Sequence, residues 1–369
     1  MKQIKFKDFI TLQRGFDLPR RKIEYGPIPV VGSTSIVGWH KEHKIDGPGV
    51  ITGRSGSLGI VQYIEDQYWP HNTTLWVKDF RGNKPKYVYY FLNNFPLKNF
   101  NSGAGVPTLN RNHLGNYDIQ IHDHSSQEKI ADLLSAYDDL IENNTRRITI
   151  LEEMAQRIYK KWFVDFKYPG HENDKLVDSK LGMIPEGWEV GCVSDYYDVR
   201  SGFAFKSKDM VESGDYGIVK IKNIQSDGLN FDTIQYISEA LIEDRAYSFE
   251  LIENDLLIAM TGATVGKVGL MPKSKDKFLL NQRVGKFFPK VDFQTNNMFM
   301  YQLSKSNNFQ ISVVNIAQGA AQPNISGKQI GSIKFPGPPS QLILRFEKLC
   351  ESIKDNVLVL NFKNQILRQ

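Results

Sequence analysis

The sequence has few cysteines and no long apolar run, and each absence excludes a class of protein. Cys192 and Cys350 are the only two thiols in 369 residues, and they match no metal or redox spacing. Two cysteines are too few for a disulfide framework, which argues against a small secreted scaffold and for a reducing compartment. No apolar run reaches 18 residues and none follows Met1, so we expect a cytoplasmic protein without a transmembrane helix or a signal peptide.

Motifs for catalysis are also missing. The Pro-Pro pair at 338–339 lacks the flanking Asn or Asp and the aromatic residue of a base methyltransferase motif. No cluster of carboxylates with a nearby lysine predicts a nuclease Mg²⁺ site. The segment "GATVGK" (262–267) has three residues between its glycines, where a phosphate-binding loop needs four, and Val268 follows its lysine, so a tight turn is the better interpretation. The seven histidines have no ligand spacing. We expect no catalytic residue, metal or cofactor in this chain.

Charge of neither sign dominates the sequence. The net charge is +5, the pI is about 8.9 and charged residues make up 24%. This small positive net charge slightly favours binding to polyanions, but alone it does not predict nucleic-acid binding. The aromatic fraction of 12% fits either core residues or a surface on which bases stack.

The chain repeats itself. "KDFITLQRGF" (7–16) matches "SDYYDVRSGF" (194–203) at an offset of 187, and "GAGVPTLNRNHLG" (103–115) matches "GAAQPNISGKQIG" (319–331) at an offset of 216. Between them, "TGRSGSLGIV" from Thr52 loosely resembles "TGATVGKVGL" from Thr261 with a one-residue gap, each a Gly-rich turn that leads into a strand. Both copies contain short β-type runs separated by turns, then a short helix, and each ends in one long helix.

The long helical segments have a heptad spacing of apolar residues rather than a simple amphipathic face. An extended seam of this kind needs a partner, and the single Asn within each is typical of a residue that fixes register. The two helices are therefore predicted to pack on each other as an antiparallel coiled coil; the alternative is two core helices in separate domains. The seam residues are Ile130, Leu134, Tyr137, Ile141, Asn144, Ile148, Leu151, Ala155, Ile158 and Trp162, then Phe346, Cys350, Ile353, Val357, Leu360, Asn364 and Leu367.

The sequence thus predicts an α+β fold with a pseudo-two-fold internal repeat. Two similar, mostly β domains are expected at 1–122 and 188–337, with a long central helix at 123–168 and a C-terminal helix at 338–369. The linker at 169–187 lies within "YPGHENDKLVDSKLGMIPEGW" (168–188), whose prolines and glycines end one copy and begin the next.

Three features make the chain resemble the specificity subunits of type I restriction–modification enzymes. The central segments "LEEMAQRIYKKWFVDF" (151–166) and "KLVDSKLGMIPEGWEV" (175–190) resemble that family's central conserved region. "GAGVPTLNRNHLG" is similar to the motif that closes each target recognition domain, and the two-copy architecture is the third feature.

The resemblance implies a subunit without chemistry of its own, in a complex that restricts DNA and methylates adenine. Each recognition domain would read one half of a bipartite, asymmetric DNA site, and the helices would set the spacing and dock two modification subunits that use S-adenosylmethionine. Restriction subunits, which need ATP and Mg²⁺, would join the outside. The second copy ends at Gln369, which matches Glu153 of the first, so its helix is expected to be shorter than the family's.

Loop residues that can bind bases or phosphates are the candidate DNA contacts, because Arg and Lys read guanine, Asn and Gln read adenine, and cations hold phosphates. The candidates are Arg20, Arg21, Lys22, Lys41, His43, Lys44, Arg54, Asn110, Arg111, Lys206, Lys208, Lys220, Lys222, Asn223, Gln322, Asn324 and Lys328. The candidates for subunit docking are Arg146, Glu152, Arg157 and Lys161, which the heptad pattern places on the outer face of the first helix.

Two other hypotheses stay open on the sequence alone. One is a single-chain enzyme that methylates or cuts DNA, which the missing cofactor motifs disfavour. The other is a coiled-coil adaptor that binds only protein, which an absence of salt-sensitive DNA binding would favour.

Overall fold

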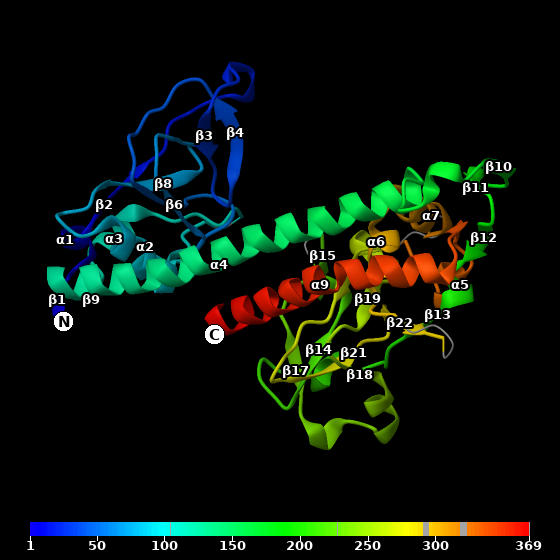
Figure 1. Cartoon of the computed structure of the whole chain (residues 1–369). Helices are drawn as coiled ribbons and strands as arrows, with labels where there is room; N and C mark the ends of the chain where they lie inside the picture. The colour runs from blue at the N-terminus through cyan, green and yellow to red at the C-terminus, as the bar shows by residue number, and fades with distance from the viewer. Residues whose placement is uncertain (104, 227, 291–294, 318–322, 369) are drawn as a thin grey trace. The chain divides into compact units, whose positions relative to one another are not determined.

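The structure is a computed structural model that describes residues 1–103, 105–226, 228–290, 295–317 and 323–368, with only the backbone described at Arg20. The chain divides into two units, Met1–Leu140 and Ile141–Gln369. Helix α4 (His124–Tyr159) runs continuously from the first unit into the second (Figure 1).

Among its described residues, unit 1 contains three small sheets. In the four-stranded sheet, every residue of the central strand "GVITG" is buried, because the sheet has packed side chains on both faces. The order of this sheet is β2 (Thr11–Arg14), β8 (Thr74–Asp79), β5 (Gly49–Gly53), β6 (Val61–Ile64). The second sheet has the order β4 (Ile36–His40), β3 (Ile28–Val31), β7 (Trp69–Pro70). The third pairs β1 (Lys2–Lys5) with β9 (Asp118–Ile121). The short helices are α1 (Phe6–Phe9), η1 (Arg20–Lys22), α2 (Pro85–Asn94), η2 (Leu97–Phe100) and α3 (Arg111–Gly115).

Unit 2 contains the same arrangement with additions. The first of its equivalent sheets has the order β13 (Tyr197–Ser201), β22 (Val284–Pro289), β19 (Leu256–Ala259), β20 (Val268–Leu270). The second has the order β17 (Gln235–Ile237), β14 (Tyr216–Val219), β21 (Lys277–Leu280), β18 (Glu250–Leu251). The third pairs β12 (Glu189–Cys192) with β23 (Lys334–Gly337). The hairpins β10 (Leu176–Ser179) with β11 (Gly182–Pro185) and β15 (Ile224–Gln225) with β16 (Gly228–Leu229) have no counterpart in the described part of unit 1. The α-helices are α5 (Val193–Tyr196), α6 (Met298–Lys305), α7 (Asn307–Ala317), α8 (Gly327–Gly331) and α9 (Ser340–Arg368). The 3-10 turns are η4 (His171–Asn173), η5 (Ser207–Asp209), η6 (Ile221–Asn223), η7 (Glu239–Leu241), η8 (Asp244–Phe249) and η9 (Gly262–Thr264).

The shared strand order confirms the internal repeat. In both units one sheet contains a parallel pair among antiparallel neighbours: β3 with β7 in the sheet β4-β3-β7, and β14 with β21 in the sheet β17-β14-β21-β18. The pairing of Thr52 with Thr261, however, is wrong by three residues. Gly56 N donates to Pro107 O at 2.9 Å and Gly262 N donates to Pro323 O at 3.0 Å, so these two glycines are the equivalent pair. Both have positive φ, 90° and 77°, which only glycine adopts without strain.

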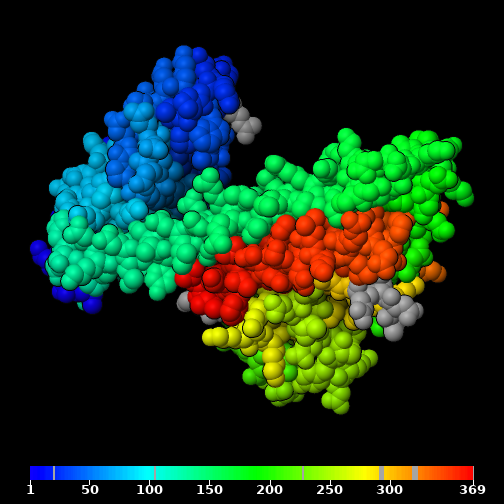
Figure 2. Space-filling model, viewed as in Figure 1, coloured from blue at the N-terminus to red at the C-terminus, as the bar shows by residue number. Residues whose placement is uncertain are grey.

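Within unit 2, α9 packs antiparallel along the part of α4 that follows Leu140 (Figures 1 and 2). The ring of Phe346, near the start of α9, contacts Tyr159 and Trp162 at centroid distances of 6.1 and 6.0 Å. Further along, Val357 and Leu360 cluster with Ile148 and Leu151. The fold therefore confirms the predicted antiparallel coiled coil over this part of the seam.

The two seam asparagines meet each other. Asn144 Nδ2 donates to Asn364 Oδ1 at 2.9 Å, and both residues are buried. Asn364 Nδ2 in turn donates to Thr145 Oγ1 at 3.2 Å. Because a shift of either helix would leave these buried amides without their partners, the pair fixes the register of the two helices.

The predicted seam is wrong for its first three positions, which lie in unit 1. Ile130 packs on the core of unit 1, and Leu134 and Tyr137 are 36% and 46% exposed. The buried positions here are Gln127, Ala131 and Ser135 at intervals of four, because α2 and the sheets of unit 1 cover a different face of the helix. Leu367, at the end of α9, and Ile141 are half-buried.

The end of the central helix also differs from the expectation of a helix to residue 168. The α-helix ends at Tyr159 and continues as a single π-helical turn, η3 (Lys160–Val164), which buries Trp162 and Phe163. Tyr168 then stacks on Trp188 at 5.6 Å, and Phe163 lies 6.1 Å from the same indole. The linker is thus folded back on the helix end and belongs to the main core of unit 2.

Candidate nucleic-acid interface

Four loops of unit 1 meet at the end of β2 and are joined by backbone hydrogen bonds. Gly15 N donates to Thr74 O at 3.1 Å, and Phe16 N donates to Pro70 O at 2.8 Å. Arg54 N donates to Thr73 O, and Leu109 N donates to Arg54 O, both at 2.8 Å. We call residues 14–17, 53–59, 71–74 and 107–110 the loop frame of unit 1.

Unit 2 has an equivalent loop frame, residues 201–204, 259–266, 281–284 and 323–326. Gly202 N donates to Val284 O at 3.1 Å and Phe203 N to Leu280 O at 2.8 Å. Met260 N donates to Arg283 O at 3.0 Å and Ile325 N to Met260 O at 2.9 Å. The frame explains the repeated Gly-Phe pair, since a Cβ at Gly15 or Gly202 would lie 2.1 Å from the carbonyl oxygen of His71 or Leu280.

Polar side chains of unit 1 form a connected network on its loop frame. Asp17 accepts a hydrogen bond from Arg14 Nη2 at 2.9 Å and a short one from Asn72 Nδ2. Arg54 Nε donates to Asn72 O at 3.1 Å. The network fixes two guanidinium groups on either side of Asn72, and such groups bind guanine edges or phosphates.

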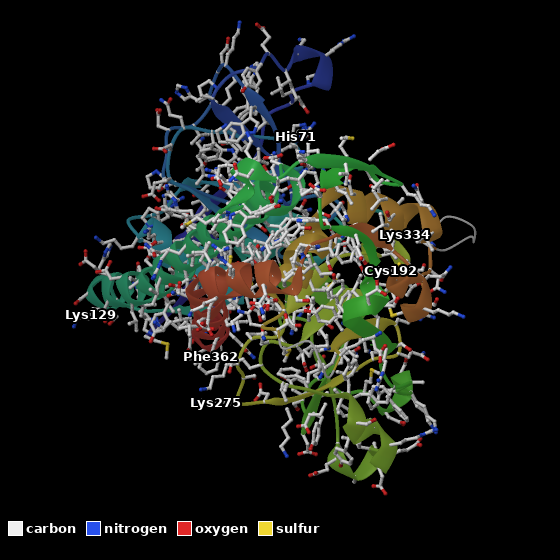
Figure 3. All side chains as sticks on the ribbon, turned by 45° about the vertical axis from the view of Figure 1, so that its right-hand side comes forward. His71, Lys129, Cys192, Lys275, Lys334 and Phe362 are labelled. Carbon is white, nitrogen blue, oxygen red and sulfur yellow. The ribbon has the colours of Figure 1, made fainter. Side chains whose placement is uncertain are left out.

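The third loop of this frame begins at His71, labelled in Figure 3. Burial of this half-buried imidazole lowers its pKa, and its Nδ1 lies 3.1 Å from Thr73 Oγ1. This shift favours the neutral ring, which can exchange a hydrogen bond. A hollow beside the ring is lined by Asp17, Pro19, Ile23, Val37 and Asn72, among others.

The structure brings some of the predicted unit 1 residues to the loop frame. Arg54 lies within it, and Arg111 lies beside it, with Nη1 donating to Leu12 O at 3.2 Å. Asn110 also lies in the frame, but its side chain caps α3 by accepting a hydrogen bond from Asn112 N at 3.0 Å. Its carbonyl oxygen is thus already engaged in stabilising the helix.

The other predicted unit 1 residues lie elsewhere. Arg21 and Lys22 are exposed on η1, whose Arg20 has only its backbone described. The remaining three follow β4: Lys41 pairs with Glu24 at 2.7 Å, which raises the lysine pKa, His43 Nε2 lies 3.3 Å from Asp46 Oδ1, and Lys44 Nζ lies 4.7 Å from the Trp69 ring.

In unit 2, five predicted residues are exposed: Lys206, Lys208, Lys222, Asn324 and Lys328. Asn324 belongs to the loop frame, and Gln322 lies outside the described residues. Lys220 Nζ donates to Gln235 Oε1 at 2.6 Å, and burial lowers the lysine pKa.

The prediction of Asn223 as a DNA contact is wrong. This side chain is 1% exposed, accepts a hydrogen bond from Lys220 N at 3.0 Å and donates to Asn230 O at 3.1 Å. An amide buried with both its groups engaged serves the turn, not a ligand.

The prediction of Glu152 as an outer-face docking residue is wrong for a similar reason. Its side chain is 18% exposed, and its carboxylate accepts hydrogen bonds from Tyr301 Oη at 2.7 Å and Lys305 Nζ at 2.8 Å. Glu152 therefore attaches α6 to α4 inside unit 2. The other three docking candidates, Arg146, Arg157 and Lys161, are exposed.

Sequence reasoning missed Arg14, Asp17, Asn72, Gln282 and Arg283, all on the loop frames. Gln282 and Arg283 are exposed. The repeat offers a signal for Arg14. It aligns with Ser201, so this position differs between the two copies although the Gly-Phe pair that follows it is the same. Asn72 begins the triplet Asn-Thr-Thr, whose residue types alone do not indicate a DNA contact.

Within the described ranges, no group of three or more His, Cys, Asp or Glu side chains is placed to hold a metal ion. None of the helices in those ranges combines the length and the apolar character that crossing a membrane requires.

Comparisons with known proteins place these features in one family. The family model described as the type I restriction modification DNA specificity domain matches residues 1–153 and 185–343. The type I restriction enzyme MjaVIII specificity subunit of Methanocaldococcus jannaschii is 27% identical over 245 residues, covering 66% of this chain and 56% of that protein. The MjaIX specificity subunit of the same organism is 25% identical over 295 residues, covering 78% and 66%.

A solved structure has the same fold. The crystal structure of a type I restriction–modification system S subunit from M. genitalium gives a TM-score of 0.59 at 15% identity, covering 99% of this chain and 94% of that one. The chain spans 56% and 66% of the length of the two M. jannaschii relatives.

Proposed function

The chain belongs to the type I restriction modification DNA specificity family, and we propose that it is a DNA-recognition subunit that reads a bipartite, asymmetric site. Residues 1–122 and 188–337 are the two recognition domains, and each reads one half-site. The observation that carries this proposal is the repeated sheet framework in two units joined by one continuous helix, with different polar side chains on equivalent loops. Because the two sets differ, the two half-sites differ.

In this proposal the chain recognises DNA and assembles the complex, and its partner subunits carry out the catalysis. Modification subunits bind S-adenosylmethionine and methylate adenine, and restriction subunits use ATP and Mg²⁺. The complex acts in the cytoplasm, where the chromosome and invading DNA meet it.

An exchange of one domain tests the recognition half of the proposal. Met1–Ile121 is replaced by the corresponding domain of another family member, so that β1 and β9 are exchanged together and their pairing is kept. Because each unit has its own core, we expect methylation mapping to show one changed half-site, with the other half-site unaltered. A change in both halves would contradict independent readers.

The proposed docking surface for modification subunits is the exposed stripe of α4 and η3 formed by Arg146, Ile150, Met154, Arg157 and Lys161. Ile150 and Met154 are 49% and 47% exposed between the basic residues. Apolar side chains among charges at the surface of a paired helix suit a protein partner.

Reversing two charges on this stripe tests the docking proposal. Arg157→Glu with Lys161→Glu should reduce assembly with the modification subunits by at least tenfold in size-exclusion chromatography, with an unchanged circular dichroism spectrum, because like charges at an interface are repelled. Lys129→Glu, an exposed change on the same helix within unit 1 (Figure 3), is the control. Full assembly of the double variant would refute this docking surface.

A further inference from the structure

The third loop of each frame is a three-residue turn held at both ends by the same hydrogen bonds. In unit 1, residues 71–73 lie between Pro70 O and Thr74 O, which accept from Phe16 N at 2.8 Å and Gly15 N at 3.1 Å. In unit 2, residues 281–283 lie between Leu280 O and Val284 O, which accept from Phe203 N and Gly202 N at the same two distances. The backbone of the two turns is therefore fixed in the same way.

The carbonyl oxygen of the third residue in each turn accepts a further backbone hydrogen bond. Thr73 O accepts from Arg54 N at 2.8 Å, and Arg283 O accepts from Met260 N at 3.0 Å. Phe16 forms a parallel bridge with His71, and Phe203 forms the same bridge with Asn281. A turn held this firmly presents its side chains with little loss of entropy on binding.

The side chains on this shared backbone differ at every position. "HNT" in unit 1 corresponds to "NQR" in unit 2, and all six residues can form hydrogen bonds. Elsewhere in the frames, several residues are the same in both units: the Gly-Phe pair, Gly56 with Gly262, and Pro107 with Pro323. A constant backbone with variable polar side chains is what two readers of different sequences need.

The neighbouring cations are arranged differently in the two frames. In unit 1 the arginines are Arg14 and Arg54, on the loops on either side of Asn72. Their equivalents in unit 2 are Ser201 and Met260, and Met260 is 6% exposed with its sulfur turned toward Gly285. Unit 2 instead has its arginine on the turn itself, at Arg283, beside exposed Gln282. Each frame thus offers at least one amide and at least one guanidinium, in a different arrangement.

We propose that residues 71–73 and 281–283 are base-reading turns, one in each domain. Asn72, supported by Arg14 and Arg54, reads bases of the first half-site, and Gln282 with Arg283 reads bases of the second. The side-chain chemistry fits adenine for the amides and guanine for the guanidinium groups in the major groove. This assignment rests on the proposed function, and it names the residues that set its specificity.

The test is selection of bound duplexes from a fully randomised pool by the full chain, alone and assembled with modification subunits. Gln282→Ala with Arg283→Ala is the informative variant, because both side chains are exposed and their removal spares the backbone bonds of the turn. We expect discrimination at one or two base pairs of the second half-site to fall about ten- to a hundredfold. The first half-site and the gap between the halves should stay as in the wild type.

Transplanting the turn of unit 2 into unit 1 tests whether the turn can confer a new base preference. His71→Asn, Asn72→Gln and Thr73→Arg together place "NQR" on the frame of unit 1, and they should change the first half-site while leaving the second unaltered. Lys275→Ala is the control: this exposed lysine lies on the loop between β20 and β21, outside the frame (Figure 3). It should leave both half-sites unchanged.

Two results would overturn the assignment. Either a Gln282→Ala/Arg283→Ala variant that selects the wild-type second half-site, or one that loses affinity equally for all duplexes, would show that the turn does not read bases. Failure of the proposed function looks different, because the wild-type chain would then enrich no bipartite sequence at all.

Discussion

Replacing Phe346 with alanine should lower the free energy of unfolding of unit 2 by about 3–5 kcal/mol, the usual cost of truncating a buried phenylalanine. Phe346 is fully buried, and its ring contacts Tyr159, Trp162 and Phe163 at 6.1, 6.0 and 5.2 Å. The side chain joins α9 to the end of α4, so the cavity would open inside the helix pair. Urea unfolding followed by tryptophan fluorescence measures the change.

Leu349→Ala is the matched control for this prediction. Leu349 lies three residues further along α9 and is 51% exposed, so its truncation should change the free energy of unfolding by less than about 0.5 kcal/mol. Similar losses for the two variants would mean that α9 does not pack on α4 through the predicted seam.

Lengthening α4 should lengthen the gap between the two half-sites. Four helix-forming residues inserted after Leu140 add about 6 Å, at 1.5 Å per residue. At about 3.4 Å per base pair, the gap should grow by one or two base pairs while both half-sites stay the same. Methylation mapping of the insertion variant measures the gap.

The site of the insertion decides what this experiment can show. Leu140 is 47% exposed and ends unit 1, whereas Asn144 is bonded to Asn364 inside the helix pair. An insertion after Leu140 leaves that pair and both cores intact, and two alanine substitutions at exposed residues 139 and 140 without a change in length serve as the control. An unchanged gap in an active insertion variant would show that α4 does not set the distance.

The repeated architecture could be predicted from the sequence because several of the repeated residues are ones that the local backbone geometry requires. The glycine of the Gly-Phe pair persists in both copies because a Cβ at Gly15 or Gly202 would meet a carbonyl oxygen, and Gly56 and Gly262 share a positive φ. The heptad seam from Asn144 onward was equally readable. Its first three positions were not, because Ile130, Leu134 and Tyr137 have the same residue types and spacing but lie where unit 1 covers another face of the helix.

The site was less predictable, since residue type does not reveal which polar side chains the fold itself uses. Asn223 and Glu152 are as polar as any DNA contact or docking residue, but one closes a turn and the other binds α6. Asn72 and Gln282 become recognisable only when hydrogen bonds from Phe16 and Phe203, far away in sequence, show that they share one position.

Selection from randomised duplexes by the wild-type chain measures whether the two units recognise separate half-sites. We expect two short, different blocks of fixed sequence separated by a gap of constant length and free sequence, because α4 connects two units whose loop frames have different side chains. A single uninterrupted block, two blocks with a variable gap, or no enriched sequence at all would contradict it.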